Sequence, residues 1–216
     1  MTAQGPPADD PRVPDLRDRL LPLDSDHLPA SPPSGEGFHA AVSLILRAGP
    51  GLDVLLIRRS ESETDPWSGH MALPGGRRDA SDPDLLFTAL RETREETGVR
   101  LDELGTPLGR LEPVRPSTFR LPPISIFPFV FCVGEQTRAR VASPEIVEVL
   151  WAPLSVLREP GARGTATIPL GETSREFPCF RYRGRVIWGL TYRILSAFFA
   201  RLPSREGAAD FDDLHA

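Results

Sequence analysis

A glycine turn followed by a cluster of glutamates constrains this chain more than any other segment. Leu73-Pro74-Gly75-Gly76 precedes, after a short loop, the run Arg91-Glu92-Thr93-Arg94-Glu95-Glu96-Thr97-Gly98-Val99. On a helix, glutamates spaced i, i+3 and i+4 share one face and repel one another. A cation among them would remove the repulsion, and oxygen ligands without nearby Cys or His suit Mg²⁺ or Mn²⁺. The spacing therefore predicts a metal-binding helix face beside a turn that lets backbone approach closely.

This segment resembles the signature of the Nudix hydrolases. Residues 91–99 match its second half, with Thr93 in an apolar slot. In the first half Asp82 stands where the signature has glutamate, and the interval from there to Arg91 is one residue longer. The resemblance covers residues 37–200 and implies an α/β fold, the Nudix-type α/β/α sandwich with a mixed β-sheet.

The resemblance also implies a site that hydrolyses a diphosphate. Catalytic and metal-binding roles fall on the three glutamates, with the Gly76 carbonyl as a further ligand of Mg²⁺ or Mn²⁺, and Arg91 is expected to pair with Asp82 or Asp84. The ligands are Glu92, Glu95 and Glu96.

Two alternatives remain for the general base: a glutamate of the signature or an acid from a later loop. Glu145 is our candidate in that loop, and Glu148 competes with it. The metal would orient a water and lower its pKa, and a carboxylate would accept its proton.

A second resemblance concerns the substrate. Nudix enzymes that act on coenzyme A carry an extra motif upstream of the glycine turn, and Leu55, Leu56, Arg59, Ser60, Gly69, Pro74, Gly75 and Gly76 fall in register with it. It implies cleavage of CoA or a CoA derivative to 3′,5′-ADP and 4′-phosphopantetheine. The substrate-binding residues that we expect are Arg58, Arg59, Ser60, Gly75 and Arg77.

Two alternatives stay open. Asp65 replaces an arginine of the CoA motif, and an anion there would repel a phosphate-rich ligand. This keeps ADP-ribose, a nucleotide sugar or a nucleoside triphosphate open as the substrate. A Nudix-fold binding module without turnover is the alternative of a different class, and the intact glutamate cluster argues against it.

The composition of the chain excludes some classes of chemistry and makes others unexpected. All 25 basic residues are Arg, which excludes lysine Schiff-base and P-loop lysine chemistry. A net charge of −5 gives no reason to expect nucleic acid as a partner. The chain has neither a secretory h-region nor a long apolar stretch, so we expect a cytoplasmic protein without a membrane span. The absence of Lys and Asn indicates a codon bias that suggests a bacterial source. Assembly as a homodimer stays open.

The pattern divides the chain into three parts. We expect a proline-rich arm over 1–35, extended or flexible with a short helix over 15–21 as the alternative, a Nudix domain over 36–202, and an acidic flexible tail over 203–216. The glutamate helix is expected to begin at Asp82-Pro83, to end at Gly98 and to bury Leu86, Leu90, Thr93 and Thr97. Strands are expected over 38–46, 53–59, 70–73, 108–112, 124–133 and 145–151, a hairpin over 177–187, and further helices over 153–157 and 188–202.

Overall fold

The computed structural model describes residues 10–23, 38–62, 68–116, 123–170 and 173–203. Its main sheet contains β1 (Phe38–Ala48), β2 (Leu52–Arg59), β3 (Met71–Ala72), β4 (Gly75–Arg77), β5 (Gly105–Arg110), β6 (Ile124–Gly134) and β7 (Ile146–Pro153). A second sheet contains β8 (Arg163–Leu170), β9 (Thr173–Tyr182) and β10 (Arg185–Trp188). The helices are α1 (Arg12–Asp18), α2 (Leu85–Thr97), α3 (Leu101–Leu104), α4 (Leu154–Leu157) and α5 (Gly189–Phe199), with a 3₁₀ turn at Pro160–Ala162.

The main sheet is mixed, as predicted. Its strand order is β3-β2-β1-β6-β5, with β4 also paired to β1 and β7 also paired to β2. The predicted hairpin of β1 and β2 is confirmed, with Leu46 opposite Val54. β1 runs parallel to β6 over its whole length, whereas its other partners are antiparallel.

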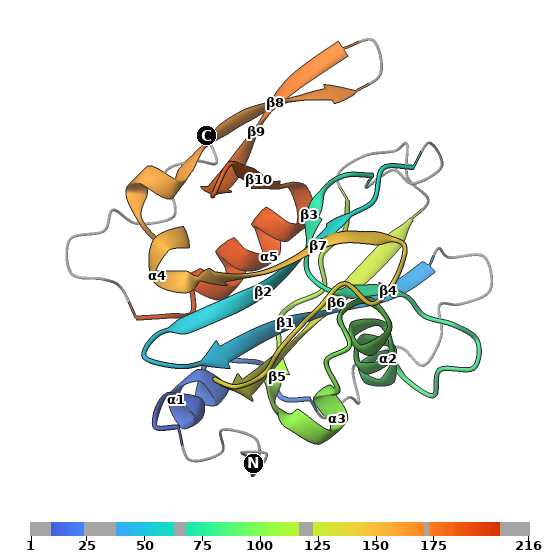
Figure 1. Cartoon of the computed structure of the whole chain (residues 1–216), viewed down its shortest axis with the longest axis vertical. Helices are drawn as coiled ribbons and strands as arrows, with labels where there is room; N and C mark the ends of the chain where they lie inside the picture. Colours follow the sequence, from blue (N-terminus) through green and yellow to red (C-terminus); the bar gives the residue numbers. More distant parts are fainter. Residues whose placement is uncertain (1–9, 24–37, 63–67, 117–122, 171–172, 204–216) are drawn as a thin grey trace.

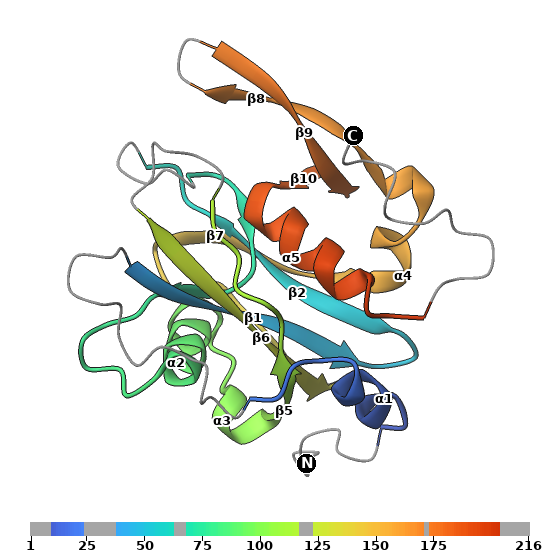
Figure 2. The same cartoon turned by 180° about the vertical axis from the view of Figure 1, so that it is seen from behind.

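Both faces of the main sheet are covered, so the α/β/α arrangement is confirmed. Leu44 and Leu46 of β1 belong to a core that also contains residues of α5, while Ala41 and Ile45 belong to a core with residues of α2. This is the two-residue alternation of a strand buried on both sides. The two views show α2 and α3 on one face and α5 on the other (Figures 1 and 2).

The second sheet was not foreseen as a separate unit. The predicted hairpin over 177–187 is present as β9 and β10, and its turn residues Arg183 and Gly184 both have positive φ, at 47° and 74°. β8 extends it on the other edge of β9. The β8–β9 ribbon projects away from the main sheet (Figure 1).

Part of the N-terminal arm is helical. The prediction of an extended arm is wrong for Arg12–Asp18, because Val13 and Leu16 bury their side chains in the core beside α5. The short helix considered as the alternative exists, but begins before residue 15. Residues 1–9 and 24–37 and the tail from 204 lie outside the described ranges. None of the described helices combines the length and apolar character that a bilayer crossing requires.

Candidate active site

The turn between β3 and β4 brings backbone against α2. Gly75 and Gly76 pair with Val42 and Ala41 of β1. A Cβ on Gly75, whose φ is 151°, would collide with the Ala41 carbonyl, and a Cβ on Gly76 would lie 2.5 Å from Cδ of Glu92. Gly75 is therefore required for the close contact of β4 with β1, whereas Gly76 leaves room for the Glu92 carboxylate.

The helix α2 begins two residues later than predicted. Its N-cap is Asp84, whose carboxylate accepts a hydrogen bond from the Phe87 N–H at 2.7 Å. Asp82 is instead buried and accepts hydrogen bonds from Arg91 Nε and Nη2 at 2.9 and 2.8 Å. The prediction that Asp82 caps the helix is wrong, because its carboxylate is committed to Arg91.

Asp82 anchors Arg91 to the loop. Arg91 holds the pKa of Asp82 down at about 2, chiefly through hydrogen bonding. The Thr88 hydroxyl and the Asp79 N–H also donate to Asp82 Oδ2. Of the two acids expected to pair with Arg91, the structure thus selects Asp82, and the shorter aspartate still reaches Arg91 from the lengthened loop.

The packing of α2 differs in part from the predicted stripe. Thr93 and Thr97 are fully buried as predicted, whereas Leu86 and Leu90 are only half-buried. Thr93 fits its apolar slot because its hydroxyl donates to Ser43 Oγ at 2.8 Å. Glu96 is also on the buried side, although the pattern placed it on an exposed acidic face. The helix is therefore rotated so that this glutamate points toward β4.

Glu96 is the most buried of the three glutamates. Only 5% of its side chain is exposed, and its Oε2 accepts a hydrogen bond from the Gly75 N–H at 2.9 Å. Burial raises the pKa of Glu96 to about 8, and the nearby charge of Glu92 adds to this effect. A buried carboxylate of this kind is stabilised in its charged form by a cation.

Glu92 and Glu95 lie progressively nearer to solvent. Burial also raises the pKa of Glu92, against the hydrogen bond that Arg91 Nη1 donates to its Oε1 at 2.8 Å. The same Arg91 nitrogen donates to Glu95 Oε2 at 3.2 Å, and 56% of the Glu95 side chain is exposed. Glu92 and Glu96 thus converge at the glycine turn, with Glu95 at its rim.

The two candidates for a base from the later loop have partners on opposite sides of the main sheet. Glu145 lies 3.5 Å from Arg59 Nη2, and Arg59 Nη1 lies 3.6 Å from Glu96 Oε1, so Glu145 adjoins the glutamates of α2. Glu148 accepts two hydrogen bonds from Arg185 of β10, at 2.8 and 3.0 Å. This geometry favours Glu145.

The expected substrate-binding residues do not all gather at the site. Arg59 contacts Glu96, but Arg58 is opposite Glu148 in the ladder with β7 and therefore shares the face turned toward β10. Ser60 is held near the site by its backbone N–H, which donates to the Glu145 carbonyl at 2.7 Å. Arg77 is exposed and its guanidinium stacks over Phe38. Asp65 lies outside the described residues.

The donor set fits a divalent cation. Within the described ranges, no three His, Cys, Asp or Glu side chains are already gathered as a metal cluster. Two desolvated carboxylates of α2 nevertheless lie against the Gly75-Gly76 backbone, and burial opposes their ionisation. Hard oxygen donors with unmet negative charge are what Mg²⁺ and Mn²⁺ require. Glu92 and Glu96 are the residues that would hold such an ion.

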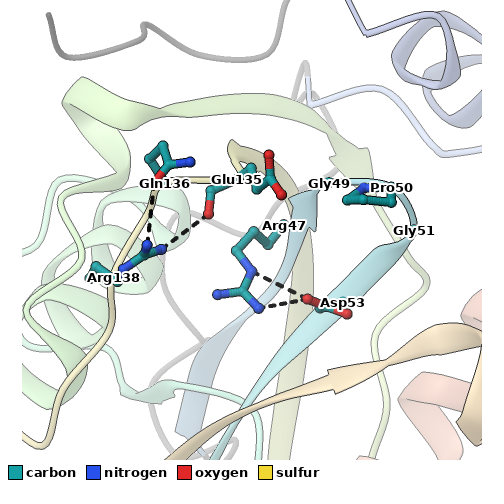
Figure 3. Close-up of a pocket in the computed structure, with 8 residues that line it drawn as sticks. All are labelled: Arg47, Gly49, Pro50, Gly51, Asp53, Glu135, Gln136 and Arg138. Carbon is teal, nitrogen blue, oxygen red and sulfur yellow. Dashed lines mark hydrogen bonds and ion pairs between the residues drawn. The ribbon is translucent and has the colours of Figure 1, made fainter.

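A hollow of about 290 Å³ lies at the opposite end of β1 (Figure 3). Its arginines are already compensated, because Arg47 pairs with Asp53 at 2.6 Å and Arg138 binds the Glu135 carbonyl and the Gln136 side chain. It is therefore not part of the carboxylate site. Its lining consists of Arg47, Gly49, Pro50, Gly51, Asp53, Glu135, Gln136 and Arg138.

Comparison with known structures supports the fold. A MutT/nudix family protein from Enterococcus faecalis superposes with a TM-score of 0.52 and 21% identity, over 78% of this chain and 63% of that one. At that identity the likeness concerns the fold alone.

Comparison of sequences reaches further. An uncharacterized Schizosaccharomyces pombe protein, C14C4.10c, is 39% identical over half of this chain, which spans only 33% of that protein. The human mitochondrial coenzyme A diphosphatase NUDT8 is 33% identical over 80% of this chain and 71% of its own length. A Yersinia enterocolitica Nudix hydrolase, NudL, is 28% identical over 75% of this chain and 80% of its own length. The family model for the NUDIX domain matches residues 37–169, so this chain belongs to the Nudix family.

Proposed function

We propose that this protein hydrolyses the diphosphate of coenzyme A or a CoA derivative to 3′,5′-ADP and 4′-phosphopantetheine, with Mg²⁺ or Mn²⁺. The observation that carries the proposal is the pair of desolvated carboxylates, Glu92 and Glu96, against the Gly75-Gly76 turn. The likeness to a relative named as a coenzyme A diphosphatase, over most of this chain, supports CoA as the substrate.

The residues divide the work by their positions. A metal held by Glu92 and Glu96 would neutralise phosphate oxygens and lower the pKa of the attacking water. Arg91, fixed by Asp82, keeps Glu92 oriented. The Gly75 N–H fixes Glu96.

Glu145 accepts the proton as the water oxygen bonds to phosphorus. The phosphorus–oxygen bond to the bridging oxygen breaks, and the leaving phosphate carries away the electron pair. Arg59 adds positive charge to the site from the end of β2, beside Glu96 and Glu145. Glu95, exposed at the rim, would add a further carboxylate to those that hold the metal.

Two variants test the choice of base. Glu145→Gln should lower kcat at least 100-fold, in keeping with the loss of general base catalysis. Glu148→Gln should leave kcat within about threefold of wild type, because its partner Arg185 is on the other face. The opposite ranking of the two variants would reject Glu145 as the base.

Competition between substrates tests the choice of CoA. Hydrolysis of CoA would be followed with ADP-ribose added as an inhibitor, and hydrolysis of ADP-ribose would be followed with CoA added. We expect kcat/KM for CoA to exceed that for ADP-ribose at least tenfold and ADP-ribose to inhibit weakly. Preference for ADP-ribose or a nucleoside triphosphate would reject CoA as the substrate and leave the proposed mechanism unchanged.

A further inference from the structure

Arg59 occupies a shared position between two acids of different elements. As the last residue of β2, it lies 3.6 Å from Glu96 of α2 and 3.5 Å from Glu145, which precedes β7. Both contacts are longer than the 2.7–2.9 Å typical of charge-assisted hydrogen bonds. The guanidinium thus lies between the two carboxylates.

The charges around Glu96 give Arg59 a specific role. Glu92 and Glu145 contribute like charge to this position, and Arg59 contributes the opposite charge. Arg91 is committed to Asp82, Glu92 and Glu95. Arg59 is therefore the counter-ion that the ionised form of Glu96 has on its β2 side, where a metal would also be attracted.

Glu145 depends on the same guanidinium for its direction. Its side chain is 69% exposed, and a long exposed side chain adopts many rotamers unless a partner restricts it. The backbone around it is fixed by the hydrogen bond from the Ser60 N–H to the Glu145 carbonyl. Arg59 is the partner that directs the carboxylate toward the site.

We propose that Arg59 is a positioning residue that competes with the divalent cation for Glu96 and, once displaced from it, holds Glu145 at the reacting water. The inference rests on the proposed function, since it assigns Glu145 its role as base. Two cations cannot share one carboxylate without repulsion, so metal binding shifts Arg59 toward Glu145. Loading of the metal and placement of the base are thereby coupled.

The test combines metal affinity with turnover. Mn²⁺ would be titrated calorimetrically into metal-free wild type, Arg59→Gln and Arg59→Lys, and kcat and KM for CoA measured on each. Arg185→Gln is the matched control, because it removes an arginine that pairs with a glutamate of β7 on the opposite face. Circular dichroism and a melting curve in EDTA verify folding.

A competing counter-ion predicts effects of opposite sign. Arg59→Gln should bind Mn²⁺ about fivefold more tightly, as expected for loss of a partly exposed ion pair, while its kcat falls at least tenfold. Arg59→Lys should keep wild-type Mn²⁺ affinity and lose part of kcat, because lysine keeps the positive charge but lacks the planar set of N–H donors of the guanidinium. Arg185→Gln should match wild type in both.

The outcomes separate this inference from the proposed function. Unchanged or weaker Mn²⁺ binding by folded Arg59→Gln, with normal binding by wild type, would overturn the inference alone. If Arg59→Gln fails to fold, weakened Mn²⁺ binding or unchanged kcat in Arg59→Lys would overturn it. Absence of Mn²⁺ binding in wild type would overturn the proposed function and the inference with it.

Discussion

Replacing Glu96 by glutamine should stabilise the metal-free protein while abolishing its activity. Burial raises the pKa of Glu96 from its ordinary 4.5 to about 8 in the folded state. The folded protein therefore binds this proton more tightly than the unfolded chain does. The stability contributed by the protonated carboxyl is complete below pH 4.5, declines as the pH rises, and is lost above pH 8.

The magnitude follows from the size of the shift. At pH 7 the unfolded glutamate is ionised and the folded one is mostly protonated. The free energy of unfolding is therefore about 3 kcal/mol lower at pH 7 than below pH 4.5. Above pH 8 the cost approaches about 5 kcal/mol, at 1.36 kcal/mol for each unit of pKa. Glutamine does not titrate and can still accept the Gly75 N–H. It loses the ion pair with Arg59, so we expect a net gain of about 2–4 kcal/mol at pH 8.5.

The assay is urea denaturation in EDTA at pH 5 and pH 8.5, followed by tryptophan fluorescence. Glu96→Gln should be clearly more stable than wild type at pH 8.5, and the gap should shrink at pH 5. Glu95→Gln is the control, because Glu95 is largely exposed and its change should stay under about 1 kcal/mol. Saturating Mn²⁺ should stabilise wild type but not Glu96→Gln. Equal stability of Glu96→Gln and wild type at pH 8.5, or a gap independent of pH, would refute the reasoning.

Three further predictions follow from the same geometry. Asp82→Asn should lower the free energy of unfolding by about 2 kcal/mol at pH 7, because the low pKa of Asp82 reflects its bond to Arg91, and acid denaturation curves that match wild type would contradict this. Gly76→Ala should displace the Glu92 carboxylate and weaken Mn²⁺ binding at least tenfold with little loss of secondary structure, as calorimetry and circular dichroism would report. Removal of divalent cations with EDTA should abolish hydrolysis, and Mg²⁺ or Mn²⁺ should restore it, whereas activity in EDTA would reject the metal assignment.

Local signals were enough to predict the elements around the site. The apolar runs of 38–46 and 53–59 on either side of the Gly49-Pro50-Gly51 turn identify two strands, and both are present as β1 and β2 with a hairpin between them. Arg183-Gly184 predicts a tight turn, and both residues adopt positive φ. Gly98 ends α2 in a left-handed conformation, as its position predicts. In each case the decisive interaction lies within a few residues along the chain.

Tertiary contacts decided the features that sequence reasoning missed. Asp82 and Asp84 are both capable N-caps, and Asp82 is withdrawn from capping by its bonds to Arg91, Thr88 and the Asp79 N–H. The burial of Glu96 depends on β4, because the Gly75 N–H of that strand donates a hydrogen bond to the Glu96 carboxylate. The periodicity of a helix contains no information about such a partner.

β8 was missed for a different reason. Its residues alternate only over the short run from Thr165 to Ile168, and Gly164 and Pro169 on either side are both disfavoured in strands. They form a strand because β9 supplies backbone partners from Thr173 to Phe180. A similar limit applies to the general base, since Glu148 is paired with Arg185 of the second sheet while Glu145 lies near Arg59, and neither partner is close in sequence.

The most direct test of the central claim is a product analysis by mass spectrometry. Purified protein with Mg²⁺ or Mn²⁺ would be offered CoA, ADP-ribose, NADH, a nucleotide sugar and nucleoside triphosphates separately, with Glu96→Gln in parallel. We predict 3′,5′-ADP and 4′-phosphopantetheine from CoA with wild type, and no products with Glu96→Gln. Intact CoA alongside a cleaved ADP-ribose or nucleotide would contradict the substrate, and intact substrates in every reaction would contradict the assignment of this protein as an active diphosphate hydrolase.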